Sequence, residues 1–518
     1  MLIKMKIEEI LERINVSRVV GILIIAVFFF SGFLHAFPNK TPMSLKRPLS
    51  SERIYKLETQ ADYEKAKARI YTGGDQILFK RGVTYKGAMS LQRSNLRPDV
   101  AIKISDFGDK QQTRPVIHAD APKMGTLDIR DSGGWIIENL ELINYSENRS
   151  QRHGIYISAT DSGTYSDFTI RNNIIRDVAG EPGNKNNGGI IIRVWGRNKP
   201  TRFTDILIEN NQIRDISGVG IRIKSPWEID PTDPRRKKSN AIGRYAFQNV
   251  VVRKNQIKNT TKNALIIASS DKPLIEYNMI GPNISTEVTG NSLFVFATDD
   301  ALVQYNEAFG NMGPAVDKDR CGFDADYNSR NSVFQFNYSH DNNCAFAIMR
   351  RYQVGLKIRY NVSQNDKYGF FFYGFPTEKG LVNAKIYNNT MYSEYRDMHV
   401  FMNFDPMKHR IPINSEFRNN IFVFAKEGAT WGAEPLEELG NRFSDNLIFG
   451  LDEPNHRGPS IFPRFRDANG VKSNVDMTDP AALDAYKLCE QTSLSSHSGV
   501  SDNVGAFRSL GIDCDDIP

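Results

Sequence analysis

The sequence predicts an all-β solenoid in which short parallel strands stack in repeated coils. Two observations carry this prediction: asparagine recurs as a periodic anchor through the middle of the chain, and an apolar residue lies three positions before every anchor. The intervals run from 23 residues (Asn255 to Asn278) to 44 residues (Asn211 to Asn255), as expected of one structural unit with loops of variable length. The ten anchors are Asn173, Asn211, Asn255, Asn278, Asn306, Asn337, Asn361, Asn389, Asn420 and Asn446.

The chain is long, folded and only mildly charged. Its 518 residues are 40% hydrophobic, which excludes a globally disordered protein. With 38 glycines, 23 prolines and 4 cysteines it is neither collagen-like nor a disulfide-rich scaffold. Lysine and arginine total 66 against 60 acidic residues, and this net charge of +6 is spread along the chain. Proteins that bind nucleic acid concentrate basic charge on one face or tail, so we expect no nucleic-acid partner.

The amino terminus predicts a membrane or export segment. Residues 19–37 form an apolar run, and the leader before it, residues 1–18, contains four basic residues. About 20 apolar residues span a bilayer as a helix, and basic flanks stay in the cytoplasm. We therefore predict a transmembrane signal-anchor helix, a linker at 38–60, and a domain held at the membrane on the exported side of the cell envelope. A cleaved signal peptide is the alternative, and it would make the protein secreted.

Each Asn anchor is expected to be a corner between two strands. Asparagine tolerates the left-handed backbone conformation that a sharp corner requires, and its amide can bond to neighbouring backbone groups, so stacked anchors would form a ladder. A second strand follows each corner after a polar loop. We align it as triplets whose first and third residues point inward and whose middle residue points outward. The triplets are 155–157, 190–192, 221–223, 265–267, 294–296, 323–325, 346–348, 370–372 and 400–402.

The segments at the two ends of the repeat are typical of a known superfamily. Residues 74–82 (GDQILFKRG) and 503–507 (NVGAF) are similar to its opening and closing segments, and the chain resembles the right-handed parallel β-helix, the pectate-lyase-like superfamily. The resemblance implies a solenoid over residues 61–510 with a capping helix at 61–71, followed by a tail at 511–518. It implies a fold more than an activity, because this fold carries many functions. An insertion at 225–248 would form a wall or lid beside a substrate groove.

Two of the four cysteines fall at equivalent positions of neighbouring coils. Cys321 and Cys344 both lie just before a triplet, so adjacent strands about 4.8 Å apart would stack them within bridging distance. Cys489 and Cys514 would be the second pair. Exported proteins favour disulfides, and two stacked, unpaired thiols are the alternative.

The outward face of the triplets carries the candidate active site. Asp324 and Asp326 lie two residues apart on one strand, so their side chains share a face at a separation of about 6.6 Å. Asp317 and Asp319 precede them on a loop, and Arg350 ends the equivalent strand of the next coil. We predict that Asp324, Asp326 and Arg350 are catalytic. A solvated ion-pair network on an ordinary surface is the alternative.

Three reactions could use this pair of carboxyl groups. Inverting glycoside hydrolysis needs an acid and a base about 6.5–9.5 Å apart. A lyase acting on uronic acids needs a base and a neutralising cation; in the superfamily this is Arg, Lys or Ca²⁺, and Asp299 with Asp300 could contribute to a calcium site. Residues 322–324 (GFD) also resemble part of the mannuronan C5-epimerase signature, but its later Pro, His and Asp are replaced in this chain.

Basic and aromatic residues around this face predict an acidic sugar polymer as the partner. Arginine pairs with carboxylates, and indole rings stack on sugar faces. The sequence contains no nucleotide-binding or zinc-type motif, so no organic cofactor is expected. The predicted substrate-binding residues are Arg193, Arg222, Lys224, Trp227, Arg351 and Tyr373.

We therefore expect an exported, monomeric β-helix protein that acts on an acidic polysaccharide as a lyase or a glycoside hydrolase. A non-catalytic protein that binds or assembles a polysaccharide is one alternative, and an uronan C5-epimerase is another.

Overall fold

The computed structural model describes the solenoid and not the two ends of the chain. The described residues are 53–196, 199–226, 246–283, 288, 290–313, 319–349, 352–374, 381–402, 414–430, 442–444, 446–449 and 471–473. All of them belong to one of the two units into which the chain divides, Pro48–Pro518. The predicted signal-anchor at 19–37, the closing segment at 503–507, Cys489 and Cys514 lie outside the described residues. Within the described part, no helix is long and apolar enough to cross a membrane.

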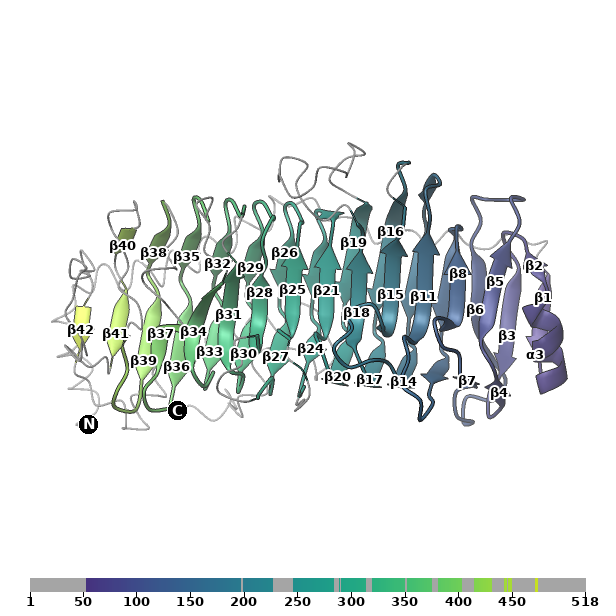
Figure 1. Cartoon of the computed structure of the whole chain (residues 1–518), viewed down its shortest axis with the longest axis horizontal. Coiled ribbons are helices and arrows are strands. Elements are labelled where there is room, and N and C mark those ends of the chain that lie inside the picture. The colour runs from purple at the N-terminus through teal and green to yellow at the C-terminus, as the bar shows by residue number, and fades with distance from the viewer. Residues whose placement is uncertain are drawn as a thin grey trace, which may run out of the picture. The chain divides into compact units, whose positions relative to one another are not determined.

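Three parallel sheets run side by side along this unit (Figure 1). In the described residues the largest sheet has 16 strands, of which β12 (Thr164–Tyr165) and β22 (Ser270–Asp271) lie beside the main path. The main path is β1 (Ile54–Leu57), β3 (Gln76–Lys80), β6 (Ile102–Phe107), β9 (Trp135–Glu138), β13 (Phe168–Arg171), β16 (Arg202–Glu209), β19 (Phe247–Arg253), β23 (Leu274–Glu276), β26 (Leu302–Gln304), β29 (Val333–Gln335), β32 (Lys357–Arg359), β35 (Lys385–Tyr387), β38 (Glu416–Arg418) and β40 (Arg442–Ser444).

The second sheet has 14 described strands, and its strands from β14 to β41 each start directly after an Asn anchor. Its order is β4 (Thr84–Lys86), β7 (Val116–Ala119), β10 (Glu141–Asn144), β14 (Ile174–Val178), β17 (Gln212–Ile216), β20 (Gln256–Thr260), β24 (Met279–Ile280), β27 (Glu307–Phe309), β30 (Tyr338–His340), β33 (Val362–Gln364), β36 (Thr390–Ser393), β39 (Ile421–Phe424), β41 (Leu447–Phe449) and β42 (Val471–Ser473).

The third sheet, of 12 described strands, contains the predicted triplets. Its order is β2 (Ile70–Tyr71), β5 (Met89–Arg93), β8 (Gly125–Arg130), β11 (His153–Ala159), β15 (Gly188–Val194), β18 (Val219–Lys224), β21 (Leu265–Ala268), β25 (Leu293–Phe296), β28 (Cys321–Ala325), β31 (Cys344–Met349), β34 (Gly369–Gly374) and β37 (His399–Met402). From β3 to β37 the chain visits the three sheets in turn, so a coil in this part contributes a strand to every sheet and pairs only with its neighbours. The predicted all-β parallel solenoid is confirmed.

The predicted asparagine ladder is present over all ten anchors. Each anchor from Asn173 to Asn420 donates through its Nδ2 to the Oδ1 of the next anchor at 2.9–3.1 Å. The ladder is buried, with anchor side chains no more than 1% exposed. The apolar residue three positions before each anchor, from Ile170 to Phe443, is buried in the core as predicted. The Asn spacing therefore marks the register of the coils.

The left-handed residue at this corner is the one before the anchor, not the anchor itself. Positive φ angles occur at Asn172 and Asn210 but also at Lys254, Tyr277 and Tyr305, among others. Here the sequence interpretation was wrong: the anchor is required for its amide hydrogen bonds and not for its backbone conformation. The strained position accepts aromatic residues, and their rings stack from coil to coil, with centroids 5.0 Å apart for Tyr277 and Tyr305.

Three of the predicted triplets are one residue out of register. Phe294 pairs with Ile266 and Asp324, so Phe294 is the outward residue and Val295 lies in the core. In the same way Phe371 and Phe401 point inward, whereas the prediction placed these two residues outward. The segments 294–296, 370–372 and 400–402 are apolar on both faces, so hydrophobic alternation could not distinguish their two faces.

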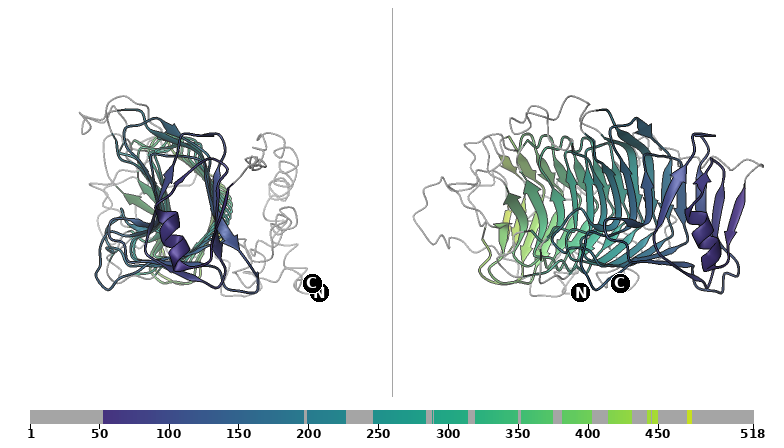
Figure 2. Two further views of the ribbon diagram at one scale, coloured as in Figure 1. Left: turned by 90° about the vertical axis from the view of Figure 1, so that its right-hand side faces the viewer. Right: turned by 45° about the vertical axis from the view of Figure 1, so that its right-hand side comes forward.

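A short helix, α3 (Gln60–Lys67), lies at the amino-terminal end of the coils (Figures 1 and 2). It is shorter than the predicted capping helix at 61–71. Thr59 and Asp62 form a capping box that satisfies the free N–H groups of its first turn. Tyr63 is fully buried and packs against Tyr85, with ring centroids 5.4 Å apart.

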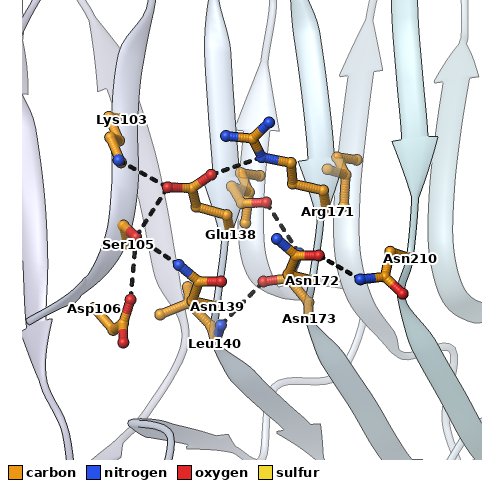
Figure 3. Close-up of polar contacts among 12 residues, drawn as sticks. Lys103, Ser105, Asp106, Glu138, Asn139, Leu140, Arg171, Asn172, Asn173 and Asn210 are labelled. Atoms are coloured by element: carbon orange, nitrogen blue, oxygen red, sulfur yellow. Dashed lines mark hydrogen bonds and ion pairs between the residues drawn. The ribbon is translucent and has the colours of Figure 1, made fainter. Parts of the chain in front are cut away.

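The outward face of the 16-stranded sheet carries a ladder of charged and polar side chains. Glu138 lies between Lys103 and Arg171 and pairs with them at 2.8 and 2.7 Å (Figure 3). The row continues with the ion pair of Glu209 and Arg253 at 2.9 Å. These charged groups form ion pairs with each other between neighbouring coils. We therefore interpret this face as a structural ladder of ion pairs and not as a substrate-binding site.

Candidate active site

Asp324 lies at the centre of β28 and points away from the solenoid core. Its neighbours Phe323 and Ala325 are fully buried in the core, so the alternation of the strand directs the Asp324 carboxyl group to the outer face of the third sheet. This outer face is covered, because Asp324 is only 3% exposed. Apolar side chains lie on the neighbouring strands, including Phe294 of β25 and Ala347 of β31. The carboxyl group is therefore held in a largely apolar environment.

Asn291 holds the Asp324 carboxyl group in place. Its Nδ2 donates to Oδ2 of Asp324 at 2.6 Å and to Oδ1 of Asp319 at 2.8 Å. The orientation of this amide is set by its Oδ1, which accepts the backbone N–H of Cys321 at 2.8 Å. The other oxygen of Asp324, Oδ1, is buried and has no hydrogen-bond partner among the described residues. One oxygen is thus fixed by Asn291, and the other makes no hydrogen bond within the described part of the chain.

The pKa of Asp324 is raised well above that of an ordinary aspartate. Burial is the largest cause, followed by the negative charges of Asp326 and Asp319. The hydrogen bond from Asn291 and the positive charge of Lys185 act in the opposite direction. Asp324 is consequently a carboxyl group that keeps its proton at a pH where ordinary aspartates have lost theirs, as a general acid must.

Asp326 lies near Asp324, as predicted, but it is more exposed to solvent than Asp324. It follows the last residue of β28, is partly exposed, and its backbone N–H donates to the Val295 carbonyl at 3.0 Å. Its Oδ1 accepts the backbone N–H of Tyr327 at 2.7 Å. The structure therefore brings together one buried and one partly exposed carboxyl group, with Asp319 as a third.

The cysteines of this region form a disulfide. Cys321 and Cys344 occupy paired positions of β28 and β31, with Cα atoms 4.3 Å apart, and their sulfur atoms are bonded. Of the two open interpretations, the bridge is the one observed. The disulfide fixes the start of the strand that carries Asp324, next to the backbone N–H that orients Asn291.

The predicted basic residues lie on the same sheet but several strands away. Arg193 and Lys224 are paired neighbours on β15 and β18, and Arg222 lies in the row of Asp324. Three strand steps separate Arg222 from Asp324, which corresponds to about 14 Å. Arg222 is 7% exposed and donates through Nη1 to the backbone carbonyl of Lys185. Arg193 stacks on Trp195, with 3.3 Å between its Cζ and the ring centroid.

The remaining predicted site residues are not gathered at Asp324 in the described structure. Asp299 and Asp300 form part of the corner after β25, where Asp300 accepts a hydrogen bond from Asn331 at 3.2 Å. Within the described residues, no group of three His, Cys, Asp or Glu side chains could hold a metal ion, and the calcium site at Asp299 and Asp300 stays a prediction. The backbone of Tyr373 pairs with that of Ile348. The others, Trp227, Asp317, Arg350 and Arg351, lie outside the described residues.

Sequence reasoning missed two residues of the site, Asn291 and Lys185. Both come from loops that precede strands of the third sheet, Asn291 before β25 and Lys185 before β15. Loops that enter at the same edge of a sheet can converge although they are distant in sequence. Neither residue belongs to a spacing pattern, and no sequence signal distinguishes them from other loop residues.

His340 belongs to a separate cluster on the second sheet. Its Nε2 lies 3.1 Å from Glu307 and its Nδ1 lies 2.7 Å from Asp341, and its ring stacks on Tyr338. Burial lowers the pKa of His340, but the hydrogen bonds to Asp341 and Glu307 outweigh burial and raise its pKa to about 9. His340 is therefore a charged structural residue.

The pH dependence of stability tests this assignment of His340. A raised pKa in the folded state means that the ion pairs stabilise fully below the unfolded value of about 6.5 and that this stabilisation is lost as the pH rises through about 9. His340→Gln should therefore cost roughly 2–4 kcal/mol at pH about 6 and much less at pH about 10, measured by chemical unfolding. The control is His118→Gln, an exposed histidine of the same sheet. A cost that does not change with pH would contradict the assignment.

The fold and the site define a parallel β-helix that carries a buried carboxyl group on one outer face. Comparison with known proteins agrees with this class, although no family model matches the chain. The chain is 26% identical over 460 aligned residues to lacto-N-biosidase of Bifidobacterium longum subsp. longum, and the match covers 72% of this chain and 28% of that protein. The chain thus spans little more than a quarter of the length of this curated relative.

Two solved structures share the fold. The GH136 lacto-N-biosidase of Eubacterium ramulus superposes with a TM-score of 0.56 at 18% identity, covering 72% of this chain and 68% of that chain in its selenomethionine derivative. The native form of the same protein gives a TM-score of 0.55 at 19% identity, covering 71% of this chain and 64% of that chain. At this identity the likeness concerns the fold, and the predicted membership in the parallel β-helix class is confirmed.

Proposed function

We propose that this protein is a carbohydrate-active enzyme that hydrolyses glycosidic bonds, with Asp324 as its general acid. The observation that carries the proposal is the Asp324 carboxyl group, which is buried, raised in pKa, fixed through one oxygen by Asn291, and left without a partner at the other oxygen. The name of the relative from Bifidobacterium longum supports the same class of reaction.

Asp326 is the proposed base. An inverting hydrolase protonates the leaving-group oxygen with one carboxyl group, while a carboxylate about 6.5–9.5 Å away activates a water molecule. Residues two apart on an extended chain have Cα atoms about 6.6 Å apart. An inverting mechanism at this pair requires the two carboxyl groups to be separated by a distance within the range above. The partial exposure of Asp326 contrasts with the burial of Asp324.

The disulfide bears on the compartment in which the enzyme works. Disulfides persist in oxidising environments and are rare in the cytosol. The bond between Cys321 and Cys344 therefore supports the proposal that the β-helix acts outside the cytoplasm, at the envelope or beyond it. Thiol labelling of the protein isolated from its native cells tests this: both cysteines should resist labelling until a reductant is added, whereas labelling without a reductant would oppose it.

A substrate panel tests the proposed reaction. The full-length protein is incubated with lacto-N-type oligosaccharides, after the name of the relative, and with neutral glycans and polyuronates, with and without Ca²⁺. Hydrolysis predicts new reducing ends without ultraviolet absorbance from an unsaturated sugar. Absorbance of an unsaturated product would establish a lyase instead, and binding without turnover across the panel would establish a binding protein. Either of these two results would overturn the proposal.

A further inference from the structure

We propose that the loop 179–187 forms a wall of the Asp324 site and that Lys185 is the positioning residue of this site, held in place by Arg222. The inference rests on the proposed role of Asp324. It gives a function to a loop that no sequence pattern singled out, and it changes the predicted role of Arg222 from substrate contact to support.

The loop crosses several coils to reach the site. It begins after β14 and ends at β15, but its tip contacts residues of later coils. The Pro182 carbonyl accepts a hydrogen bond from Thr261, which follows β20, at 3.3 Å. A Cβ atom placed on Gly183 would lie 3.5 Å from Val288, which precedes β25. The loop therefore extends along the solenoid from β15 as far as the coil that carries Phe294 and Asn291.

Hydrogen bonds within the loop and at its base fix this path. The Asn187 side chain accepts the Glu181 backbone N–H at 3.2 Å and donates to the Ser217 carbonyl at 2.7 Å. Asn184 donates to the Glu181 carboxylate at 2.7 Å. At the end of the loop, Asn186 accepts a hydrogen bond from Arg193 at 3.0 Å. A loop with this many internal bonds holds its side chains in defined positions.

Arg222 fixes the part of the loop that carries Lys185. Its guanidinium group lies on the covered outer face of β18 and donates to the Lys185 carbonyl. From there the Lys185 side chain reaches Phe294, with 4.9 Å between Nζ and the ring centroid. Phe294 is the paired neighbour of Asp324 on the adjacent strand, at a strand spacing of about 4.8 Å. The ammonium group therefore lies over the strand next to that of Asp324, close enough for its charge to act on the Asp324 carboxyl group.

The charges around Asp324 explain what this ammonium group contributes. Two negative charges act on Asp324, from Asp326 just after β28 and from Asp319 on the preceding loop. The residues paired with Asp324 on β25 and β31 are the uncharged Phe294 and Ala347. Lys185 is a cation whose charge acts on Asp324. When Asp324 gives its proton to the leaving-group oxygen, its O–H bond breaks and a carboxylate remains among two others. Lys185 stabilises that carboxylate.

The protonation of Asp324 can be measured without any substrate. Infrared difference spectra between the wild type and Asp324→Asn isolate the C=O stretch of the protonated Asp324 carboxyl group, and a pH titration gives its midpoint. Lys185→Met should shift this midpoint to higher pH, because the stabilising charge is removed. Lys185→Arg, which keeps the charge, and Lys258→Met, which removes an exposed lysine from β20 of another sheet, should leave it unchanged. An unshifted midpoint in Lys185→Met would overturn the inference.

Arg222→Met tests the support of the loop. Hydrogen–deuterium exchange of peptides covering 181–187 should become about tenfold faster, because a charge-assisted hydrogen bond to the loop is lost. The Asp324 midpoint should move in the same direction as in Lys185→Met. Unchanged hydrogen–deuterium exchange of this loop in Arg222→Met would contradict the proposed support of the loop by Arg222.

Failure of the proposed function and failure of this inference give different results. If the wild type hydrolyses no glycan but Lys185→Met shifts the Asp324 titration midpoint, only the proposed function is contradicted. A protein that hydrolyses glycans but titrates identically with and without Lys185 would contradict the inference alone.

Discussion

Asp324→Asn should lower the rate of glycoside hydrolysis by about 10²–10⁴-fold, the usual contribution of a general acid, and should at the same time stabilise the protein at neutral pH. An amide cannot give its proton to a leaving group, so turnover falls. The stability gain follows from the raised pKa of Asp324. At neutral pH the unfolded wild type carries an ionised Asp324 that must take up a proton to fold, whereas the amide needs no proton.

The sign of the stability change depends on pH. A carboxyl group whose folded pKa is raised favours the folded state fully below its unfolded pKa of about 3.8, and this contribution is lost as the pH rises through the folded value. The melting temperature of Asp324→Asn relative to the wild type should therefore increase from acidic to neutral pH. Calorimetry over this pH range measures it.

Asp128→Asn is the matched control for Asp324→Asn. Asp128 is fully buried on the same outer face, but it is ion-paired with Arg130 at 2.7 Å. The same substitution should here destabilise the protein, because it leaves the Arg130 guanidinium group without its carboxylate. If both substitutions changed stability in the same direction, the account of Asp324 as an unpaired, protonated carboxyl group would be contradicted.

Asn306→Ala should destabilise the solenoid by roughly 3–5 kcal/mol. The Asn306 amide donates to the Ile275 carbonyl and to Asn337, each at 3.0 Å, and its Oδ1 accepts from the backbone and the side chain of Asn278. Alanine removes these bonds and leaves buried polar groups of both neighbouring coils unsatisfied. Urea unfolding measures the loss.

Two variants give this prediction its controls. Asn95→Ala replaces an exposed asparagine outside the ladder and should change stability by no more than about 0.5 kcal/mol. Asn306→Asp keeps the accepting oxygen but loses the donors and buries a charge, so it should also be costly at neutral pH. A cost for Asn306→Ala no larger than that of Asn95→Ala would mean that the ladder does not hold the coils together.

The sequence was sufficient for the solenoid because one side chain recurs with one function. A ladder of buried amides needs asparagine in every coil, so the anchors identify the coils despite intervals that vary with loop length. Hydrophobic alternation was a weaker guide. It succeeded at Phe323-Asp324-Ala325, where a charge marks the outer face, and it failed at Phe370-Phe371-Phe372, where both faces are apolar.

The carboxyl groups of the site could be predicted, but their environment could not. Residues two apart along one strand direction tend to share a face whatever surrounds them, so the proximity of Asp326 to Asp324 could be predicted. The contacts that decide the chemistry come from other coils, with Asn291 33 residues before Asp324 and Lys185 much further away. The buried position of Arg222 depends equally on the loop above it, which a strand pattern does not describe.

The most direct measurement of the general acid compares two leaving groups. Wild type and Asp324→Asn are assayed on a glycosyl fluoride, which needs no protonation to depart, and on the matching glycoside of a poor leaving group. We predict a loss of about 10²–10⁴-fold on the poor leaving group and a much smaller loss on the fluoride. An equal loss on both substrates, or no loss on either, would contradict the role of Asp324 as the acid that protonates the departing oxygen.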